Sequence, residues 1–120
     1  MDQRPLVSIV DDDPSVRASL PDLLNEFGFM VRTFASAEEF LASDCIGRTR
    51  CLILDISMPG MSGPAMQREL TRRRHEIPII FVTAHEDAAL ISRLLAKGAV
   101  ACLSKPFSAA ALHDALKTAF

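Results

Sequence analysis

Largely apolar runs alternate with amphipathic stretches along the whole chain. The apolar runs cover residues 6–10, 30–34, 51–54, 79–82 and 100–103, and each has the length of a β-strand. Between these runs, hydrophobic residues recur with the period of an α-helix, so that they form one apolar face. The pattern therefore predicts β-strands that alternate with α-helices from one end of the chain to the other.

Local signals mark where the helices begin and end. Asp13 precedes Pro14, which is typical of an N-cap followed by the first helical residue. The sequence SAEE at residues 36–39 predicts a capping box that opens a short helix. The later helices are predicted after the loop PGMSGP at residues 59–64, before Gly98, and from Ser108 to Phe120.

Strands this apolar are usually buried on both faces of a parallel sheet, with helices covering each face. The crossovers between parallel strands are right-handed. We therefore predict an α/β fold, a flavodoxin-like doubly wound (βα)5 sandwich whose parallel five-stranded sheet has the order 2-1-3-4-5. A single domain over residues 1–120 is expected. Ligands of such sheets bind at the carboxyl ends of the strands, near the switch point between strands 1 and 3.

Composition narrows the class of protein further. The net charge of −2 gives no sign of a nucleic-acid-binding or membrane-binding surface. The apolar runs are too short to span a bilayer, and the first residues do not resemble a signal peptide. The three cysteines fit no metal-binding or redox spacing, so we expect free thiols in a reducing, cytoplasmic setting.

Polar side chains follow four of the five predicted strands. Asp11 and Asp12 follow the first strand, Asp55 the third, Thr83 the fourth and Lys105 the fifth. Two carboxylates about 4 Å apart repel by roughly 4 kcal/mol at an effective dielectric constant of about 20. Such a pair therefore either binds a proton or holds a divalent cation. Mg²⁺ fits best, because it binds one or two carboxylates together with water and phosphate oxygens.

Taken singly, these residues have plainer interpretations. Asp13 suits a helix cap better than a metal ligand, and Asp11 and Asp12 could be solvated charges at the end of a strand. Thr83 could be an ordinary turn residue, and Lys105 a solvated lysine. It is the combination of the strand-1 acids with Asp55 that favours a cation site.

Four segments together resemble the receiver domain of bacterial two-component response regulators. They are VDDD at residues 10–13, LDISMPGMSG at 54–63, VTA at 82–84 and KPF at 105–107. The resemblance extends over essentially the whole chain. The sequence TAHED at residues 83–87 and the closing KPF are most similar to the FixJ-like branch of this family.

The resemblance implies a role for each acid. Asp55 matches the aspartate that accepts a phosphoryl group. Asp11 and Asp12 match the acidic pair that holds Mg²⁺, with Asp12 the more direct ligand. Ser57 matches the position whose backbone carbonyl group completes the metal shell.

The resemblance also implies how the phosphoryl group is sensed. Thr83 matches the hydroxyl group that binds it, and Lys105 matches the lysine that pairs with it, with a cis peptide bond expected between Lys105 and Pro106. Cys102 occupies the position where the family usually has a Tyr or Phe that turns inward on activation. We therefore expect weaker coupling between Thr83 and the fifth strand, unless Cys102 is simply a small core residue.

By this resemblance the chain is a phosphorylation-controlled switch rather than a turnover enzyme. Its phosphodonor is expected to be a histidine kinase, and its signal is expected to leave through the face formed by helix 4, strand 5 and helix 5. A C-terminal DNA-binding output domain, outside this chain, is expected to control transcription. We expect no membrane contact, no direct nucleic-acid binding, and a monomer that dimerises when phosphorylated.

Other functions remain open from the residues alone. The sequence DDDPS at residues 11–15 contains the Asp-x-Asp-x-Ser pattern of haloacid-dehalogenase-type phosphatases, but only Asp114 follows Lys105, where that class needs a second acidic pair. A flavodoxin is disfavoured because three aspartates would repel the phosphate of its cofactor. A receiver-like docking module that is never phosphorylated is the third alternative.

Overall fold

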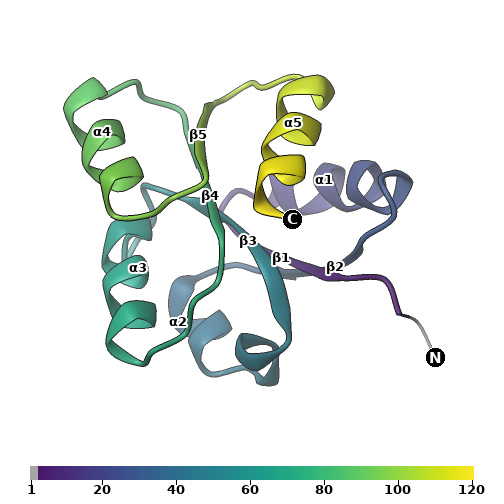
Figure 1. Cartoon of the computed structure of the whole chain (residues 1–120), viewed down its shortest axis with the longest axis horizontal. Helices are drawn as coiled ribbons and strands as arrows, with labels where there is room; N and C mark the ends of the chain where they lie inside the picture. The colour runs from purple at the N-terminus through teal and green to yellow at the C-terminus, as the bar shows by residue number, and fades with distance from the viewer. Residues whose placement is uncertain (1–2) are drawn as a thin grey trace.

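The computed structural model describes residues 3–120 and contains a parallel sheet of five strands in the order β2-β1-β3-β4-β5. The strands are β1 (Leu6–Val10), β2 (Met30–Phe34), β3 (Thr49–Asp55), β4 (Ile79–Thr83) and β5 (Ala101–Ser104). This order confirms the predicted doubly wound fold. It places β1 and β3 side by side in the middle of the sheet (Figure 1).

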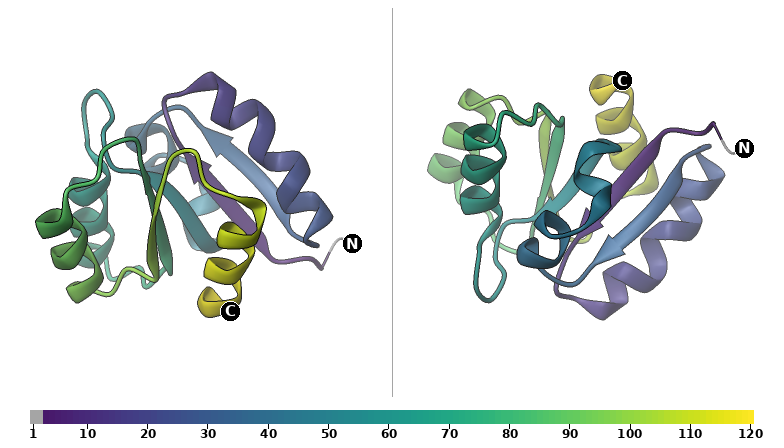
Figure 2. Two further views of the ribbon diagram at one scale, coloured as in Figure 1. Left: turned by 90° about the horizontal axis from the view of Figure 1, so that it is seen from above. Right: turned by 90° about the horizontal axis from the view of Figure 1, so that it is seen from below.

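Helices cover both faces of the sheet. They are α1 (Pro14–Glu26), α2 (Ala37–Leu41), α3 (Gly63–Arg72), α4 (Ala88–Ala96) and α5 (Ala109–Ala119), with a short 3₁₀ helix, η1, at Asp44–Gly47. Figure 2 shows α1 and α5 on one side of the sheet and α2, α3 and α4 on the other. The first helix begins as predicted, because the side chain of Asp13 accepts a hydrogen bond from the amide of Ser15.

The strands have buried side chains on both faces. Leu52 and Leu54 of β3 pack into the core beneath α2, α3 and α4, whereas Cys51 and Ile53 pack into the core beneath α1 and α5. This alternation follows from the two-residue period of a strand. It explains why the strands are apolar without a polar face, as expected for a sheet covered on both sides.

Several boundaries differ from the prediction. Strand β3 begins at Thr49 and ends at Asp55, because Asp55 still pairs with Val82 of β4. The last helix was predicted to reach Phe120, whereas α5 ends at Ala119 and Phe120 is its C-cap. It lies past the last residue of α5 and is half exposed, with its ring packed against that of Phe29 at a centroid distance of 5.2 Å.

The 3₁₀ helix η1 was not predicted either, because its sequence has too few residues to show a period. Within residues 3–120, none of the helices has both the length and the apolar composition needed to cross a bilayer.

Candidate functional site

The register of the sheet places two carboxyl groups next to each other. Val10 of β1 pairs with Leu54 of β3, so the residues that follow them, Asp11 and Asp55, are neighbours at the carboxyl edge of the sheet. The amide of Asp11 extends the sheet by donating a hydrogen bond to the carbonyl oxygen of Phe34 at 3.1 Å. The convergence of the two acids is therefore a direct result of parallel strand pairing.

Asp12 completes a cluster of three carboxyl groups. Asp11, Asp12 and Asp55 each contribute an oxygen atom, and these atoms all lie within 4.8 Å of one another. Asp11 is fully buried and Asp55 is 5% exposed, whereas Asp12 is exposed, so the cluster has one side open to solvent. Hard divalent cations prefer carboxylate oxygens, and Mg²⁺ usually keeps several of its waters. The three residues therefore fit a magnesium ion.

Burial and nearby negative charge change the acidity of Asp55. Its pKa is raised from 3.8 to about 7, first by burial and then by the negative charge of Asp11, while the positive charge of Lys105 acts in the opposite direction. Near neutral pH, the carboxyl group therefore binds a proton in a substantial share of molecules when no cation is present. A divalent cation would replace this proton and favour the carboxylate.

Lys105 supplies positive charge from the end of β5. Its peptide bond to Pro106 is cis, and its amide donates a hydrogen bond to the carbonyl oxygen of Thr83 at 2.7 Å. Its ammonium group donates a hydrogen bond to Asp11 Oδ2 at 2.9 Å and lies 3.8 Å from Asp55 Oδ1. Burial lowers the pKa of Lys105, but the hydrogen bond to Asp11 and the charges of Asp11 and Asp55 raise it more. Lys105 is therefore cationic and is bound more closely to Asp11 than to Asp55.

The hydroxyl group of Thr83 is occupied by a neighbour in sequence. Thr83 is the last residue of β4 and is buried. Its Oγ1 donates a hydrogen bond to the carbonyl oxygen of His85 at 2.8 Å and accepts one from the amide of His85 at 3.0 Å. A hydroxyl group has only one proton to donate, so Thr83 makes no hydrogen bond to the acidic cluster in this state.

The loop between β3 and α3 carries Ser57 on the open side of the sheet edge. The Ser57 carbonyl oxygen accepts no hydrogen bond from any of residues 3–120, so its lone pairs are available to a ligand. The loop ends at Gly63, whose amide donates to the carbonyl oxygen of Ile56 at 3.0 Å. A Cβ atom at Gly63 would clash with the backbone oxygen of Asp55, so glycine lets α3 begin this close to the site.

Sequence reasoning missed two contacts that position the site. Glu38 of α2 accepts a hydrogen bond from the amide of Met61 at 3.2 Å, beside Gly60, whose φ is +74°. Arg17 of α1 donates a hydrogen bond to the carbonyl oxygen of Asp11 at 2.8 Å. Glu38 was interpreted only as part of a helix start, and neither contact has a local signal because each depends on how a helix packs against a loop.

Another missed contact joins the loop after β4 to β5. The hydroxyl group of Ser104 donates a hydrogen bond to Glu86 Oε1 at 2.9 Å. Glu86 follows directly after His85, the partner of Thr83, and Ser104 directly precedes Lys105. This hydrogen bond therefore links the two segments that carry the predicted phosphoryl-sensing residues.

Cys102 lies on β5, away from the acidic cluster. It pairs in register with Phe81 of β4 and packs, partly buried, against the core beneath α3 and α4. Burial raises the pKa of its thiol. The cysteines of the described chain are all free, and both Cys45 and Cys51 are fully buried.

Comparison with known proteins gives a consistent result. The family model described as "Response regulator receiver domain" matches residues 7–117. The chain is 45% identical over 114 residues to Nodulation protein W of Bradyrhizobium diazoefficiens, and 42% identical over 113 residues to the transcriptional regulatory protein TdiR of Thauera aromatica. These matches cover 95% and 94% of the chain but 50% of each relative. The chain thus spans about half the length of the curated relatives it matches.

Solved structures give the same answer for the fold. The response regulator StyR superposes with a TM-score of 0.89 at 45% identity, over 97% of this chain and 59% of that one. FixJ-N superposes with a TM-score of 0.85 at 37% identity, over 98% of this chain and 94% of that one. The similarity to FixJ-N covers nearly all of both chains, so the whole fold is shared.

Proposed function

The chain belongs to the response regulator receiver domain family, and from this premise we propose that Asp55 is the residue at which it accepts a phosphoryl group. Receiver domains are regulatory signalling domains of two-component systems, and phosphorylation controls them. The observation that carries the proposal is the environment of Asp55. It is a buried carboxyl group, adjacent in register to Asp11 and within reach of the Lys105 ammonium group.

In the proposed reaction, a carboxylate oxygen of Asp55 attacks the phosphorus atom of the donor. The new bond is an O–P bond, and the bond that breaks is the P–N bond of a phosphohistidine, whose imidazole leaves. Negative charge on the phosphoryl oxygens must be neutralised as they approach the acids. Lys105 would do this, and the 3.8 Å between its ammonium group and Asp55 Oδ1 supports the role.

Asp11, Asp12 and Asp55 would hold a magnesium ion, with the carbonyl oxygen of Ser57 as a further ligand. When bound, the ion neutralises charge on the phosphoryl oxygens. The cluster within 4.8 Å and the unpaired Ser57 carbonyl group support this assignment. The raised pKa of Asp55 supports it as well, because burial and then the charge of Asp11 disfavour a bare carboxylate, and a cation would offset both effects.

Thr83 would then report the new phosphoryl group. Its hydroxyl proton now points to the His85 carbonyl oxygen and would transfer its hydrogen bond to a phosphoryl oxygen. The segment of His85 and Glu86 would then be free of its hydrogen bond to Thr83. Glu86 in turn accepts a hydrogen bond from Ser104 of β5. This connection supports a signal that passes from Thr83 and Lys105 to α4, β5 and α5.

The partners follow from the relatives. Several of them are named as transcriptional or response regulators, and the chain covers about half of their length. We therefore assign a histidine kinase as the phosphodonor and a C-terminal DNA-binding output domain as the target, both in the cytoplasm. Dimerisation through the α4-β5-α5 face on phosphorylation belongs to the same proposal.

The haloacid-dehalogenase-type alternative loses its support. Among residues 3–120, the one cluster of potential metal ligands is that of Asp11, Asp12 and Asp55, and Asp114 lies on α5 outside it. A docking module that is never phosphorylated differs from the proposal in one measurable respect, which is the chemistry of Asp55.

Acetyl phosphate with Mg²⁺ is expected to add a single phosphoryl group to the protein. The adduct should be released by hydroxylamine, as an acyl phosphate is, and intact-mass spectrometry measures both steps. Asp55→Asn should abolish the modification, because an amide oxygen is a poor nucleophile. Asp22→Asn, which changes an exposed acid of α1, is the matched control and should leave it intact. Phosphorylation that persists in Asp55→Asn would place the acceptor elsewhere, and an unmodified wild type would favour the docking module.

A further inference from the structure

A hollow lies where β1, β2 and β3 begin, at the edge of the sheet opposite to the acidic cluster. Its volume is about 300 Å³, at the lower end of the range of small-ligand pockets. Four arginines line it, together with Gln3, Pro5, Leu6 and Met30, and we call it the arginine hollow. None of the residues that we assign to phosphoryl transfer lines it.

Parallel pairing of the strands brings the four arginines together. The paired residues at the starts of the three strands are Leu6, Met30 and Thr49. Each arginine lies within two residues of one of these in the sequence, and the four are Arg4, Arg32, Arg48 and Arg50. The net charge of the whole chain, which is −2, therefore hides a local excess of positive charge.

The arginines have little counter-charge among the described residues. No acidic residue in the range 3–120 lines the hollow. Arg32 and Arg50 are exposed, and their side chains form no ion pair within this range. Arg48 lies 3.6 Å from an oxygen of Asp44, but the two side chains are 55% and 83% exposed, so this pair contributes little. An anion that enters the hollow would thus find at least two guanidinium groups without a counter-ion.

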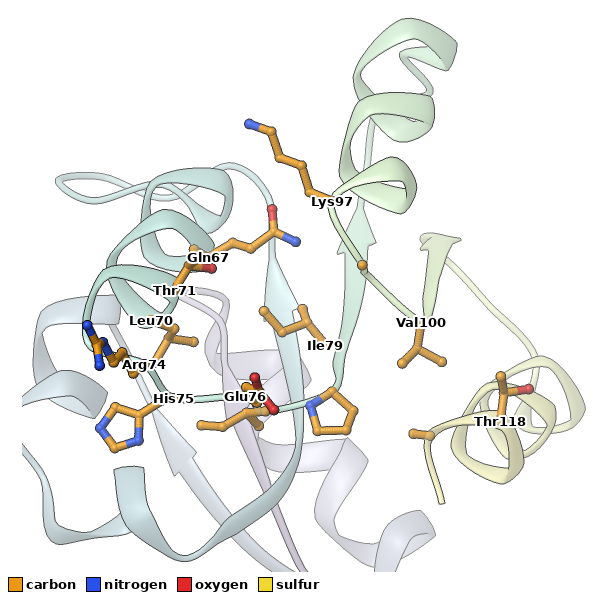
Figure 3. Close-up of a pocket in the computed structure, with 14 residues that line it drawn as sticks. Gln67, Leu70, Thr71, Arg74, His75, Glu76, Ile79, Lys97, Val100 and Thr118 are labelled. Carbon is orange, nitrogen blue, oxygen red and sulfur yellow. The ribbon is translucent and has the colours of Figure 1, made fainter.

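A second hollow, near the starts of β4 and β5, differs in this respect. Figure 3 shows Arg74, His75 and Lys97 around it together with Glu76, so side chains of both signs line it. Its buried Gln67 has an Oε1 atom without a hydrogen-bond partner among residues 3–120. Mixed charge does not favour a ligand of either sign. In the arginine hollow, by contrast, the lining charges in the described chain are all positive.

Protection of the sheet edge accounts for only one of the four arginines. Charged side chains on an edge strand oppose pairing with other chains, and Arg32 lies on β2, which is an edge strand. Arg48 and Arg50 lie at the start of β3, which is flanked by β1 and β4. Their position around the same hollow therefore needs another reason.

We propose that the arginine hollow binds an anion with two or three linked phosphate groups, either inorganic polyphosphate or the phosphate tail of a nucleotide. A phosphate group carries up to about two negative charges and three acceptor oxygens, whereas a carboxylate carries one charge and two oxygens. Linked phosphates therefore concentrate enough charge for several arginines in a hollow of about 300 Å³. Each guanidinium group can donate two parallel hydrogen bonds to phosphate oxygens.

The first test is a titration of the ¹⁵N-labelled protein with tripolyphosphate, followed by NMR in a phosphate-free buffer. Mg²⁺ and phosphodonors are left out, so the outcome is independent of the proposed phosphoryl transfer. Saturable shifts are expected at the amides of Leu6, Met30 and Arg50, and not at Thr83. Absence of such shifts at about 5 mM tripolyphosphate, a concentration that reveals even millimolar binding, would overturn the proposal.

Other anions then define the chemistry of the ligand. Citrate has three carboxylates and should bind at least about fivefold more weakly than tripolyphosphate, because its charge is less concentrated. Citrate that binds as tightly as tripolyphosphate would refute the preference for phosphate. ATP carries the same linked phosphates on a nucleoside. Tighter binding of ATP would identify a nucleotide as the ligand, and tighter binding of tripolyphosphate would identify inorganic polyphosphate.

Substitutions locate the binding site. Arg32→Gln and Arg50→Gln should each weaken tripolyphosphate binding by about three- to tenfold, as measured by isothermal titration calorimetry, because each removes a charged hydrogen-bond donor. Arg68→Gln is the matched control, since Arg68 is an exposed arginine of α3 outside the hollow, and it should bind as the wild type does. An equal loss of affinity in all three variants would mean that tripolyphosphate responds only to the net charge of the protein, and the site would be wrong.

Arg32→Lys and Arg50→Lys separate the shape of the guanidinium group from its charge. Lysine keeps the positive charge but cannot donate two parallel hydrogen bonds in a fixed plane. Each variant should therefore bind tripolyphosphate about two- to threefold more weakly than the wild type and more tightly than the corresponding glutamine variant. Lysine variants that bind as weakly as the glutamine variants would support the paired hydrogen bonds most strongly. Lysine variants that bind as tightly as the wild type would refute these hydrogen bonds.

Discussion

Asp55 destabilises the folded chain when it is a bare carboxylate. Its pKa is 3.8 in an ordinary setting and about 7 in the fold, with burial as the first cause and the charge of Asp11 as the second. Between these two pH values the folded protein binds more protons than the unfolded one. The contribution of Asp55 to the free energy of unfolding therefore falls as the pH rises through this window, and it stays low above it.

We predict that Asp55→Asn is more stable than the wild type at about pH 8 without Mg²⁺, by about 1–3 kcal/mol. The difference should become small near pH 3, below both pKa values, where Asp55 is mostly protonated in the folded and in the unfolded wild type. Adding Mg²⁺ at pH 8 should stabilise the wild type but not the variant. Urea unfolding at the two pH values measures all three effects. If wild type and Asp55→Asn were equally stable at both pH values, the folded state would not disfavour the Asp55 carboxylate, and the prediction would be wrong.

Lys105 competes with a metal ion for the same acids. Its ammonium group is 2.9 Å from Asp11 and 3.8 Å from Asp55. Lys105→Met is therefore expected to bind Mg²⁺ more tightly, by about three- to tenfold, because it removes a nearby positive charge. The same variant should be phosphorylated more slowly by acetyl phosphate, since Lys105 no longer neutralises the phosphoryl oxygens.

Isothermal titration calorimetry of wild type and variant gives the Mg²⁺ affinity. Lys117→Met removes an exposed lysine of α5 and should bind Mg²⁺ as the wild type does. Weaker Mg²⁺ binding by Lys105→Met would show that this lysine orders the carboxylates for the metal instead of competing with it.

Helix α2 and the loop after β3 are joined by the hydrogen bond between Glu38 and the amide of Met61. The loop carries the Ser57 carbonyl group that we assign to the metal, so α2 helps to hold a metal ligand in place. Glu38→Ala is expected to speed hydrogen exchange at the Met61 amide and to weaken Mg²⁺ binding by about two- to fivefold, because a charge-assisted hydrogen bond is lost.

Glu39→Ala is the matched control for this prediction. Glu39 is also exposed, and its backbone amide donates a hydrogen bond to Ser36 Oγ, which the substitution retains. NMR-detected hydrogen exchange and calorimetry on the two variants distinguish them. Equal effects would mean that the stability of α2, rather than the Glu38 contact, governs the loop.

Strand β5 carries Cys102, at the position where the resemblance to receiver domains implies an aromatic ring. Cys102 pairs with Phe81 and is partly buried, so a small thiol stands at this position. A ring would fill the space behind Thr83 if that residue moved toward a phosphoryl group, and a thiol fills it less completely. We therefore predict weaker coupling from the site to the α4-β5-α5 face.

The thiol itself can measure this coupling. Cys45 and Cys51 are fully buried and burial raises the pKa of Cys51 to about 12, so an alkylating reagent should modify only Cys102 in the folded protein. If the thiol turns inward on activation, beryllofluoride with Mg²⁺ should slow this reaction about two- to fivefold. Peptide mapping by mass spectrometry gives the rate.

Asp55→Asn provides the control for the alkylation experiment, because the phosphoryl mimic needs the carboxylate of Asp55. The alkylation rate of this variant should not respond to beryllofluoride. If the alkylation rate of the wild type did not change at saturating beryllofluoride, Cys102 would be a passive core residue. The signal would then leave the site through other residues.

Across the molecule, the sequence predicted the features that follow from hydrophobic periodicity and from the order of the strands in the sheet. The apolar runs predicted each strand, and the strand order then placed Asp11 beside Asp55, which the register confirms. The starts of two helices were also predicted correctly, because Asp13 and Ser108 are the N-caps of α1 and α5. These features are local or follow from topology alone.

Contacts between distant segments could not be predicted in this way. The Glu38–Met61 hydrogen bond spans 23 residues, and the link from Lys105 to Asp11 spans 94. The assignment of Lys105 to the phosphoryl group stays a prediction, and the hydrogen bond from its ammonium group to Asp11 was not foreseen. That hydrogen bond depends on the distance between side chains, which no pattern along the chain encodes. The same holds for the unpaired Oε1 atom of Gln67, which only a packed structure reveals.

The single hydroxyl proton of Thr83 has a consequence for how a signal can be graded. That proton is now donated to the His85 carbonyl oxygen, and it cannot be donated to a second acceptor at the same time. Under the proposed function, each molecule therefore has one hydrogen-bond pattern or the other at any moment, and no halfway arrangement satisfies both acceptors. An intermediate response in the cell then reflects the proportion of molecules in each pattern, and not how far any one molecule has moved.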